Sequence, residues 1–167
     1  LAPTAAAALI GVLAEVVGQR AVHVVNAMHL ATGRGIGVER TRLTPREDYA
    51  EYLEVRLTGE EESIRVGGAV LEGAHPRVVR IGEYHVDILP RGDLVLLRNR
   101  DVPGVIGRVG TALAAAGINI GQYNVARLEA GGQALAAIGV DARLSAEHME
   151  TLRALPEVTA VRQVELD

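Results

Sequence analysis

The chain has 167 residues, of which 49% are hydrophobic and 2% aromatic, and it carries a net charge of −4. That charge, without a basic stripe interleaved with aromatic side chains, argues against nucleic-acid binding. The absence of cysteine excludes disulfides, thiolate nucleophiles and iron–sulfur ligands, and it fits a cytoplasmic protein. The apolar stretch over residues 5–17 is too short to cross a bilayer and contains Glu15, so we expect no membrane partner.

The first ninety residues predict an α/β unit with helices on an antiparallel sheet. Apolar residues at helical spacing predict a helix over 4–17, and a second helix over 28–34 is expected to end at Gly35. Strands are predicted over residues 21–25, 36–39, 52–57, 64–71, 77–81 and 84–89. Because the chain does not begin with Met, we expect a fragment whose first unit lacks its first element.

A hairpin is predicted around Gly82-Glu83, a pair of residues suited to a two-residue turn. In that register Val79 faces Val86 on the buried side, and Arg80 lies opposite His85 on the other side.

Residues 90–93 are a turn-forming cluster that divides the chain into domains 1–92 and 93–167. In the second domain the pattern predicts strands over 94–100, 118–128, 134–141 and 158–166, and helices over 104–116 and 145–156. The second helix is expected to begin at Ser145 as its N-cap. The order βαββαβ predicts an α+β, ferredoxin-like domain with both helices on one face of the sheet.

Three polar side chains flank the helix predicted over 104–116. Asn99 and Asp101 lie in the polar corner before it, where the strand over 94–100 ends, and Asn119 follows it. Free N–H groups at a helix start bind carboxylates, and an aspartate binds ammonium groups, so the segment is interpreted as an amino-acid sensor. An equally weighted alternative is that Asp101 caps the helix and Asn119 stabilises a turn.

We find no catalytic constellation and no metal site in the sequence. The glycine-rich residues 33–37 lack the spacing of a dinucleotide site, and the five histidines lack paired metal-ligand spacing. No serine stands in a nucleophile-elbow pattern, and Glu60-Glu61-Glu62 is interpreted as a solvated loop.

Two stretches resemble known domains. One pair of segments resembles the ACT domain, a βαββαβ module that senses small molecules in amino-acid metabolism. These segments are DVPGVIGRVGTALAAAGINI and GGQALAAIGVD. An earlier pair of segments resembles the intervening domain of long-form D-3-phosphoglycerate dehydrogenase. These segments are VVNAMHLATGRGIGVE and GGAVLEGAHPRVVRIGEYHVDILPRGDLVLL. Together they resemble the C-terminal regulatory part of that serine-biosynthetic enzyme. The resemblance implies an NAD-dependent oxidoreductase as the parent, with its NAD-binding and substrate domains outside this chain.

The resemblance further implies that two ACT domains associate edge to edge and bind L-serine at their interface, in a homodimer that is part of a tetramer in the parent. The implied effector residues are Asn99, Asp101, Gly104, Val105, Ile106 and Asn119. Asp101 would pair with the serine ammonium group, backbone amides at the helix start would hold the carboxylate, and Asn119 would come from the partner chain. Asn99 is a departure, because family members often carry His or Tyr there.

An anion site is implied by the resemblance at Arg77, Arg80 and His85 of the hairpin. Alternation places Arg77 on the same side as Val79. The alternative to an anion site is that these charged residues lie on a solvated face of the sheet. Tyr84 favours this alternative, because the family relatives carry a basic residue at that position.

Two other functions stay open at this point. One is the β-type unit of an iron–sulfur L-serine dehydratase, although its usual Ser-rich segment with a His is not found in this sequence. The other is a stand-alone ACT-type protein that binds an amino acid.

Overall fold

The computed structural model describes residues 2–41, 51–71 and 75–166. No helix in these ranges is long and apolar enough to cross a membrane. By its contacts the chain divides into two compact units, residues 1–44 and 45–167, which we describe separately. The division predicted at 92/93 falls within the second unit, at the start of the first strand of its second sheet.

The first unit is helical. It contains α1 (Ala2–Val17), a short 3₁₀ helix η1 (Gln19–Ala21) and α2 (Ala27–Thr32). Its core is formed by the buried residues Ala6, Leu9, Leu13, Val22, Ala27 and Ala31. The helix stop at Gly35 is confirmed, since this glycine follows α2 with a φ of +71°.

The strand predicted over 21–25 is wrong. The side chain of Asn26 accepts a hydrogen bond from the His23 N–H at 2.8 Å and donates one to the Ala21 carbonyl at 2.9 Å. These bonds take up backbone groups that a strand would offer to a neighbour, and they hold the segment in a turn. Residues 36–39 form no strand either, because Ile36 and Val38 instead pack against the helices.

A four-stranded antiparallel sheet opens the second unit, in the order β1-β2-β3-β4. Its strands are β1 (Glu51–Thr58), β2 (Ser63–Leu71), β3 (His75–Ile81) and β4 (Tyr84–Ile88). The predicted hairpin is confirmed at its turn, where Gly82 has a φ of +58° and Arg80 pairs with His85. The predicted pairing of Val79 with Val86 is wrong, because a register shift between Val78 and Arg80 bulges β3 at that point.

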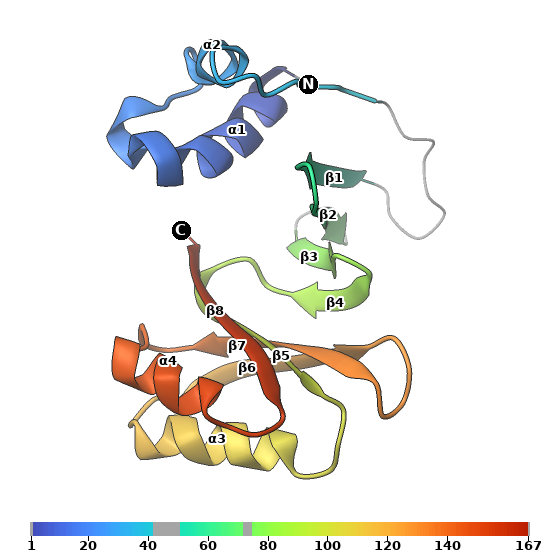
Figure 1. The fold of residues 1–167 in the computed structure, drawn as a ribbon, viewed down its shortest axis with the longest axis vertical. Coiled ribbons are helices and arrows are strands. Elements are labelled where there is room, and N and C mark those ends of the chain that lie inside the picture. The colour runs from blue at the N-terminus through green and yellow to red at the C-terminus, as the bar shows by residue number, and fades with distance from the viewer. Residues whose placement is uncertain (1, 42–50, 72–74, 167) are drawn as a thin grey trace. The chain divides into compact units, whose positions relative to one another are not determined.

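The second sheet and its two helices have the predicted ferredoxin-like fold. The elements are β5 (Gly92–Arg100), α3 (Val105–Ala115), β6 (Ile120–Arg127), β7 (Gln133–Val140), α4 (Ala146–Arg153) and β8 (Val158–Leu166). The sheet has the antiparallel order β6-β7-β5-β8, and α3 and α4 cover one of its faces (Figure 1). Alternate residues of β5 and β7, such as Val95, Leu97 and Ile138, are buried against these helices.

The opposite face of this sheet packs against β4. Tyr84, Val86 and Ile88 alternate along β4 as its buried residues and form one cluster with residues of β5, β6 and β7. The Gln122 side chain joins the two sheets, donating to the Asp87 carbonyl at 2.8 Å and accepting from the Leu89 N–H at 3.4 Å. The sheet of the ferredoxin-like domain is therefore covered by α3 and α4 on one face and by the β1–β4 sheet on the other.

Ser145 caps α4 as predicted, because its Oγ accepts a hydrogen bond from the His148 N–H at 3.2 Å. Ser145→Ala leaves that N–H without its acceptor, so we expect a loss of about 1 kcal/mol in the free energy of unfolding. Urea denaturation measures this loss. Ser145→Asp is the control, since Asp supplies an equivalent acceptor and should cost only a few tenths of that amount. Equal losses in the two variants would contradict the capping role.

Candidate functional site

A pocket of about 480 Å³ lies at the start of α3. One wall is formed by the end of β5, the loop that follows it and the first turn of α3, from Asn99 and Asp101 through Gly107. Tyr123, Val125 and Arg127 of β6 line it as well, together with the turn residues Ala130 and Gly131. The pocket therefore brings together the predicted polar corner and the end of a neighbouring strand.

The start of α3 presents backbone N–H groups to this pocket. Gly104 precedes the helix with a φ of +91°, a left-handed conformation that favours glycine, and no side chain caps the helix. The first helical hydrogen bond across this end runs from the Arg108 N–H to the Gly104 carbonyl, at 3.0 Å. The amides of Val105 and Ile106 lie before it and keep the positive character of a helix N-terminus.

Asp101 does not cap the helix, so this part of the capping alternative is wrong. Its Oδ2 accepts hydrogen bonds from the Gly131 N–H at 3.1 Å and from Nη1 of Arg127 at 3.0 Å. The Gly131 hydrogen bond and then the Arg127 guanidinium lower the pKa of this carboxyl below its ordinary value. Asp101 is therefore a carboxylate at neutral pH, and it is available to a cationic ligand group.

Asn99 is buried, with 5% of its surface exposed, yet it lines the pocket. Its Nδ2 donates to the Arg100 carbonyl at 2.8 Å, while its Oδ1 has no hydrogen-bond donor among the described residues. Tyr123 lies nearby, and burial raises the pKa of its hydroxyl, which therefore stays protonated at neutral pH. The pocket thus offers a carboxylate, amide donors, an amide oxygen and a phenol.

Asn119 lies after the other end of α3 and does not line this pocket. It is exposed, and its Nδ2 donates to Oδ2 of Asp141 at 2.9 Å. Within its own chain this hydrogen bond connects the loop before β6 to the residue that follows β7. The predicted role of Asn119 requires a partner chain and stays a prediction.

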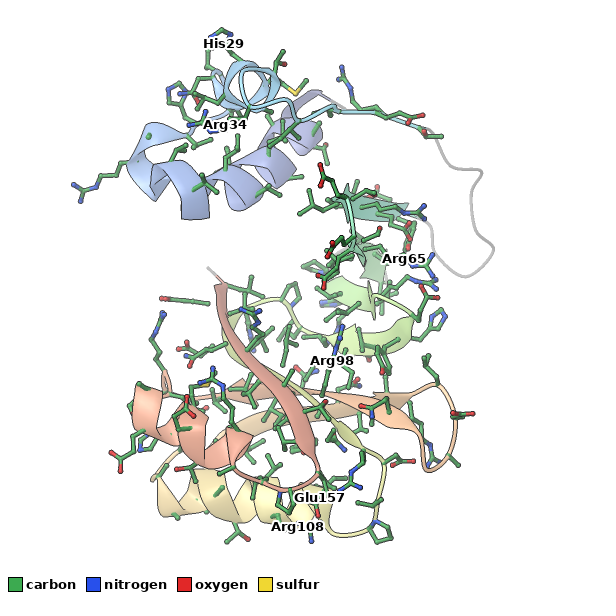
Figure 2. The ribbon with its side chains drawn as sticks, in the orientation of Figure 1. His29, Arg34, Arg65, Arg98, Arg108 and Glu157 are labelled. Carbon is green, nitrogen blue, oxygen red and sulfur yellow. The ribbon has the colours of Figure 1, made fainter. Side chains whose placement is uncertain are left out.

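Sequence reasoning missed two residues around the pocket. Arg127 lies 26 positions from its partner Asp101, and Arg108 lies 49 positions from Glu157, which its guanidinium contacts at 2.7 and 3.2 Å. Figure 2 shows Arg108 and Glu157 together beside α3. For Arg127 a signal was present, because strict alternation along β6 places it on the same face as Tyr123 and Val125.

The two arginines of the predicted anion site in the hairpin each lie near a carboxylate of the chain itself. Nη2 of Arg80 lies 3.8 Å from Glu83, and Nε of Arg77 lies 3.6 Å from Asp87. Arg77 lies beside the exposed Asp87 of β4, and its Nε is buried without a hydrogen-bond partner among the described residues. Anion binding at Arg77, Arg80 and His85 stays a prediction.

Arg65 of β2 strengthens the pairing at the hairpin turn. Its Nη2 contacts Glu83 at 2.6 Å and its Nε donates to the Gly82 carbonyl at 3.1 Å, and Figure 2 labels it beside this sheet. In residues 2–41, 51–71 and 75–166 no group of three or more His, Asp or Glu is placed to hold a metal ion.

Comparison with known families assigns both parts of the chain. Residues 1–82 match the family model of the D-3-phosphoglycerate dehydrogenase intervening domain, and residues 94–157 match that of the ACT domain. These matches confirm the two resemblances noted in the sequence. They also agree with the fold, since residues 94–157 run from the start of β5 to the loop before β8.

Several curated relatives of this chain are named D-3-phosphoglycerate dehydrogenase, the enzyme named in the first family model. The chain is 31% identical over 145 residues to a D-3-phosphoglycerate dehydrogenase of Bacillus subtilis, covering 87% of the chain and 28% of the relative. It is 31% identical over 161 residues to one of Archaeoglobus fulgidus, covering 95% and 30%. It is 30% identical over 155 residues to the chloroplastic D-3-phosphoglycerate dehydrogenase 3 of Arabidopsis thaliana, covering 85% and 26%. The chain thus spans between a quarter and a third of the length of these relatives.

Proposed function

This chain carries a D-3-phosphoglycerate dehydrogenase intervening domain followed by an ACT domain, and we propose that it is the regulatory part of such a dehydrogenase, binding L-serine as feedback effector. The observation that carries the proposal is the pocket at the start of α3. It places an ionised carboxylate, Asp101, and an uncapped helix N-terminus around one volume of about 480 Å³.

The two ends of an α-amino acid fit these two features. The ligand ammonium group would contact Asp101, in a charge-assisted hydrogen bond. The ligand carboxylate would accept from the backbone amides of Gly104, Val105 and Ile106, where the helix dipole favours an anion. The hydroxymethyl side chain of serine would meet Asn99, whose Oδ1 would accept a hydrogen bond from the serine hydroxyl.

A second copy of the chain completes this site in the proposal. Asn119 is exposed and outside the pocket of its own chain, so a partner ACT domain would bring its Asn119 to the ligand. β6 is an edge strand and carries three pocket-lining residues, which makes it the edge at which two domains would meet. We therefore propose a homodimer through the ACT domains, which would be part of a tetramer in the parent.

In the parent, serine binding would change the arrangement of subunits and slow the reaction at a distant site. Such a coupling between sites is typically about 1–3 kcal/mol. We propose that the parent is a cytoplasmic, NAD-dependent oxidoreductase of serine biosynthesis, with NAD bound outside this chain. The residues of this chain would supply effector binding and subunit contact.

Isothermal titration calorimetry tests the effector assignment directly. L-Serine is expected to bind the 167-residue chain at millimolar concentration or below, because both of its charged ends find partners in the pocket. Glycine, which lacks the hydroxyl, is expected to bind more weakly. O-Phospho-L-serine tests whether the hairpin cations Arg77 and Arg80 take a phosphate. A chain that gives no heat with serine at several millimolar would contradict the proposal.

Sedimentation velocity provides a second readout on the same sample. Serine at the shared interface is expected to favour the dimer, since a ligand bound by two chains stabilises their association. A serine-binding chain that stays monomeric at all concentrations would contradict the interfacial site and leave the single-chain pocket as the binding site.

A further inference from the structure

The pocket contains a cation that the proposed contacts do not use. Arg127 comes from the end of β6, and its Nη1 donates to Oδ2 of Asp101 at 3.0 Å. The contact uses one nitrogen and one oxygen. Among the described residues, Nε and Nη2 of Arg127 and Oδ1 of Asp101 have no hydrogen-bond partner. Each member of the pair therefore keeps an unused hydrogen-bonding position in the pocket that both of them line.

We propose that Arg127 is the specificity-determining residue of this site, binding the ligand carboxylate together with the backbone amides at the start of α3, while Asp101 binds the ligand ammonium group. The inference rests on the proposed function, because it assumes that this pocket takes an amino acid. It adds to that function a rule for ligand choice: the ion pair selects zwitterions over compounds with only one of the two charges.

The rule follows from the charges in the pocket. An amine that contacts Asp101 brings a second cation next to the Arg127 guanidinium, and like charges at this distance repel. A carboxylate that contacts Arg127 brings a second anion next to Asp101, with the same consequence. A zwitterion brings both charges, so each residue gains an opposite charge. Only the zwitterion therefore extends the pair without a penalty.

The surroundings of Arg127 suit this role. Its side chain is 60% exposed, so a ligand can reach the guanidinium without displacing protein atoms. Alternation along β6 places it on the same side as Tyr123 and Val125, which line the same pocket. The Oδ1 of Asn99 accepts no hydrogen bond from the described residues and is an unused acceptor in this pocket. It gives the site a hydrogen-bonding group that Arg127 and Asp101 leave available.

The test compares L-serine with L-serinamide, which keeps the ammonium group and replaces the carboxylate by a neutral amide. Arg127→Gln is expected to weaken serine binding about 10- to 100-fold, the range of a hydrogen bond to a charged group. The same substitution is expected to leave serinamide binding unchanged or to improve it, because it removes the repelling cation. Calorimetry of both ligands with both proteins measures the four dissociation constants.

Arg143→Gln is the matched control. Arg143 is 67% exposed, is paired with Glu165 in the same domain and does not line the pocket, so its loss should leave both ligands unaffected. Equal weakening of serine and serinamide by Arg127→Gln would show that Arg127 only supports the loop, and it would overturn the inference. Unchanged serine binding in Arg127→Gln would also overturn it, while the proposed function would stand. Failure of serine to bind the unaltered chain would instead refute the proposed function.

Discussion

Asp101→Asn is expected to weaken L-serine binding about 100-fold or more, the largest effect on binding that we predict. The substitution removes the only negative charge that lines the pocket among the described residues. It also leaves the Arg127 cation without its partner, so the ligand ammonium group would be repelled as well as unpaired. The Asn side-chain oxygen can still accept from the Gly131 N–H, which keeps the loop in place.

Calorimetric titration with serine checks this expectation, and Glu165→Gln is the control. Glu165 is an ion-paired carboxylate of the same domain that lies outside the pocket, so its loss should not change serine binding. If Asp101→Asn bound serine as tightly as the unaltered chain, Asp101 would have no role in holding the ammonium group. The site would then have to be placed elsewhere.

Leu113→Ala is expected to lower the free energy of unfolding by about 2–5 kcal/mol, the largest effect on stability. Leu113 lies on α3 with 1% of its surface exposed, in the cluster that joins both helices to the sheet. Truncation removes buried apolar surface and leaves a cavity that the close-packed sheet cannot fill. Aromatic side chains are scarce in this chain, so aliphatic residues such as Leu113 supply most of the core volume.

Urea denaturation followed by circular dichroism measures the loss. Leu128→Ala is the control, because Leu128 is 59% exposed and its truncation should change stability by less than about 0.5 kcal/mol. Similar small changes in both variants would contradict the assignment of Leu113 to the core. The amides at the start of α3 line the pocket, and truncating Leu113 loosens the packing of this helix. Leu113→Ala should therefore also weaken serine binding.

Most elements were predictable because their signals are local. Apolar spacing along α3, the turn glycine at position 82 and the Ser145 cap each act within a few residues, and the structure confirms them. The failed strand at 21–25 shows the limit of such signals. There a side chain, Asn26, competes with the backbone for hydrogen bonds, and the apolar pattern does not reveal that competition.

By itself the sequence determined the ferredoxin-like order of elements, the family resemblance and the polar corner with Asp101 at the start of α3. Only the tertiary structure decided the partners of that corner. It paired Asp101 with Arg127, left the helix start uncapped and put Asn119 outside the pocket of its own chain. The bulge in β3 likewise removed the predicted pairing of Val79 with Val86. The physical reason is the same in both cases, since register and strand pairing join residues far apart along the chain, and such contacts depend on the whole sheet.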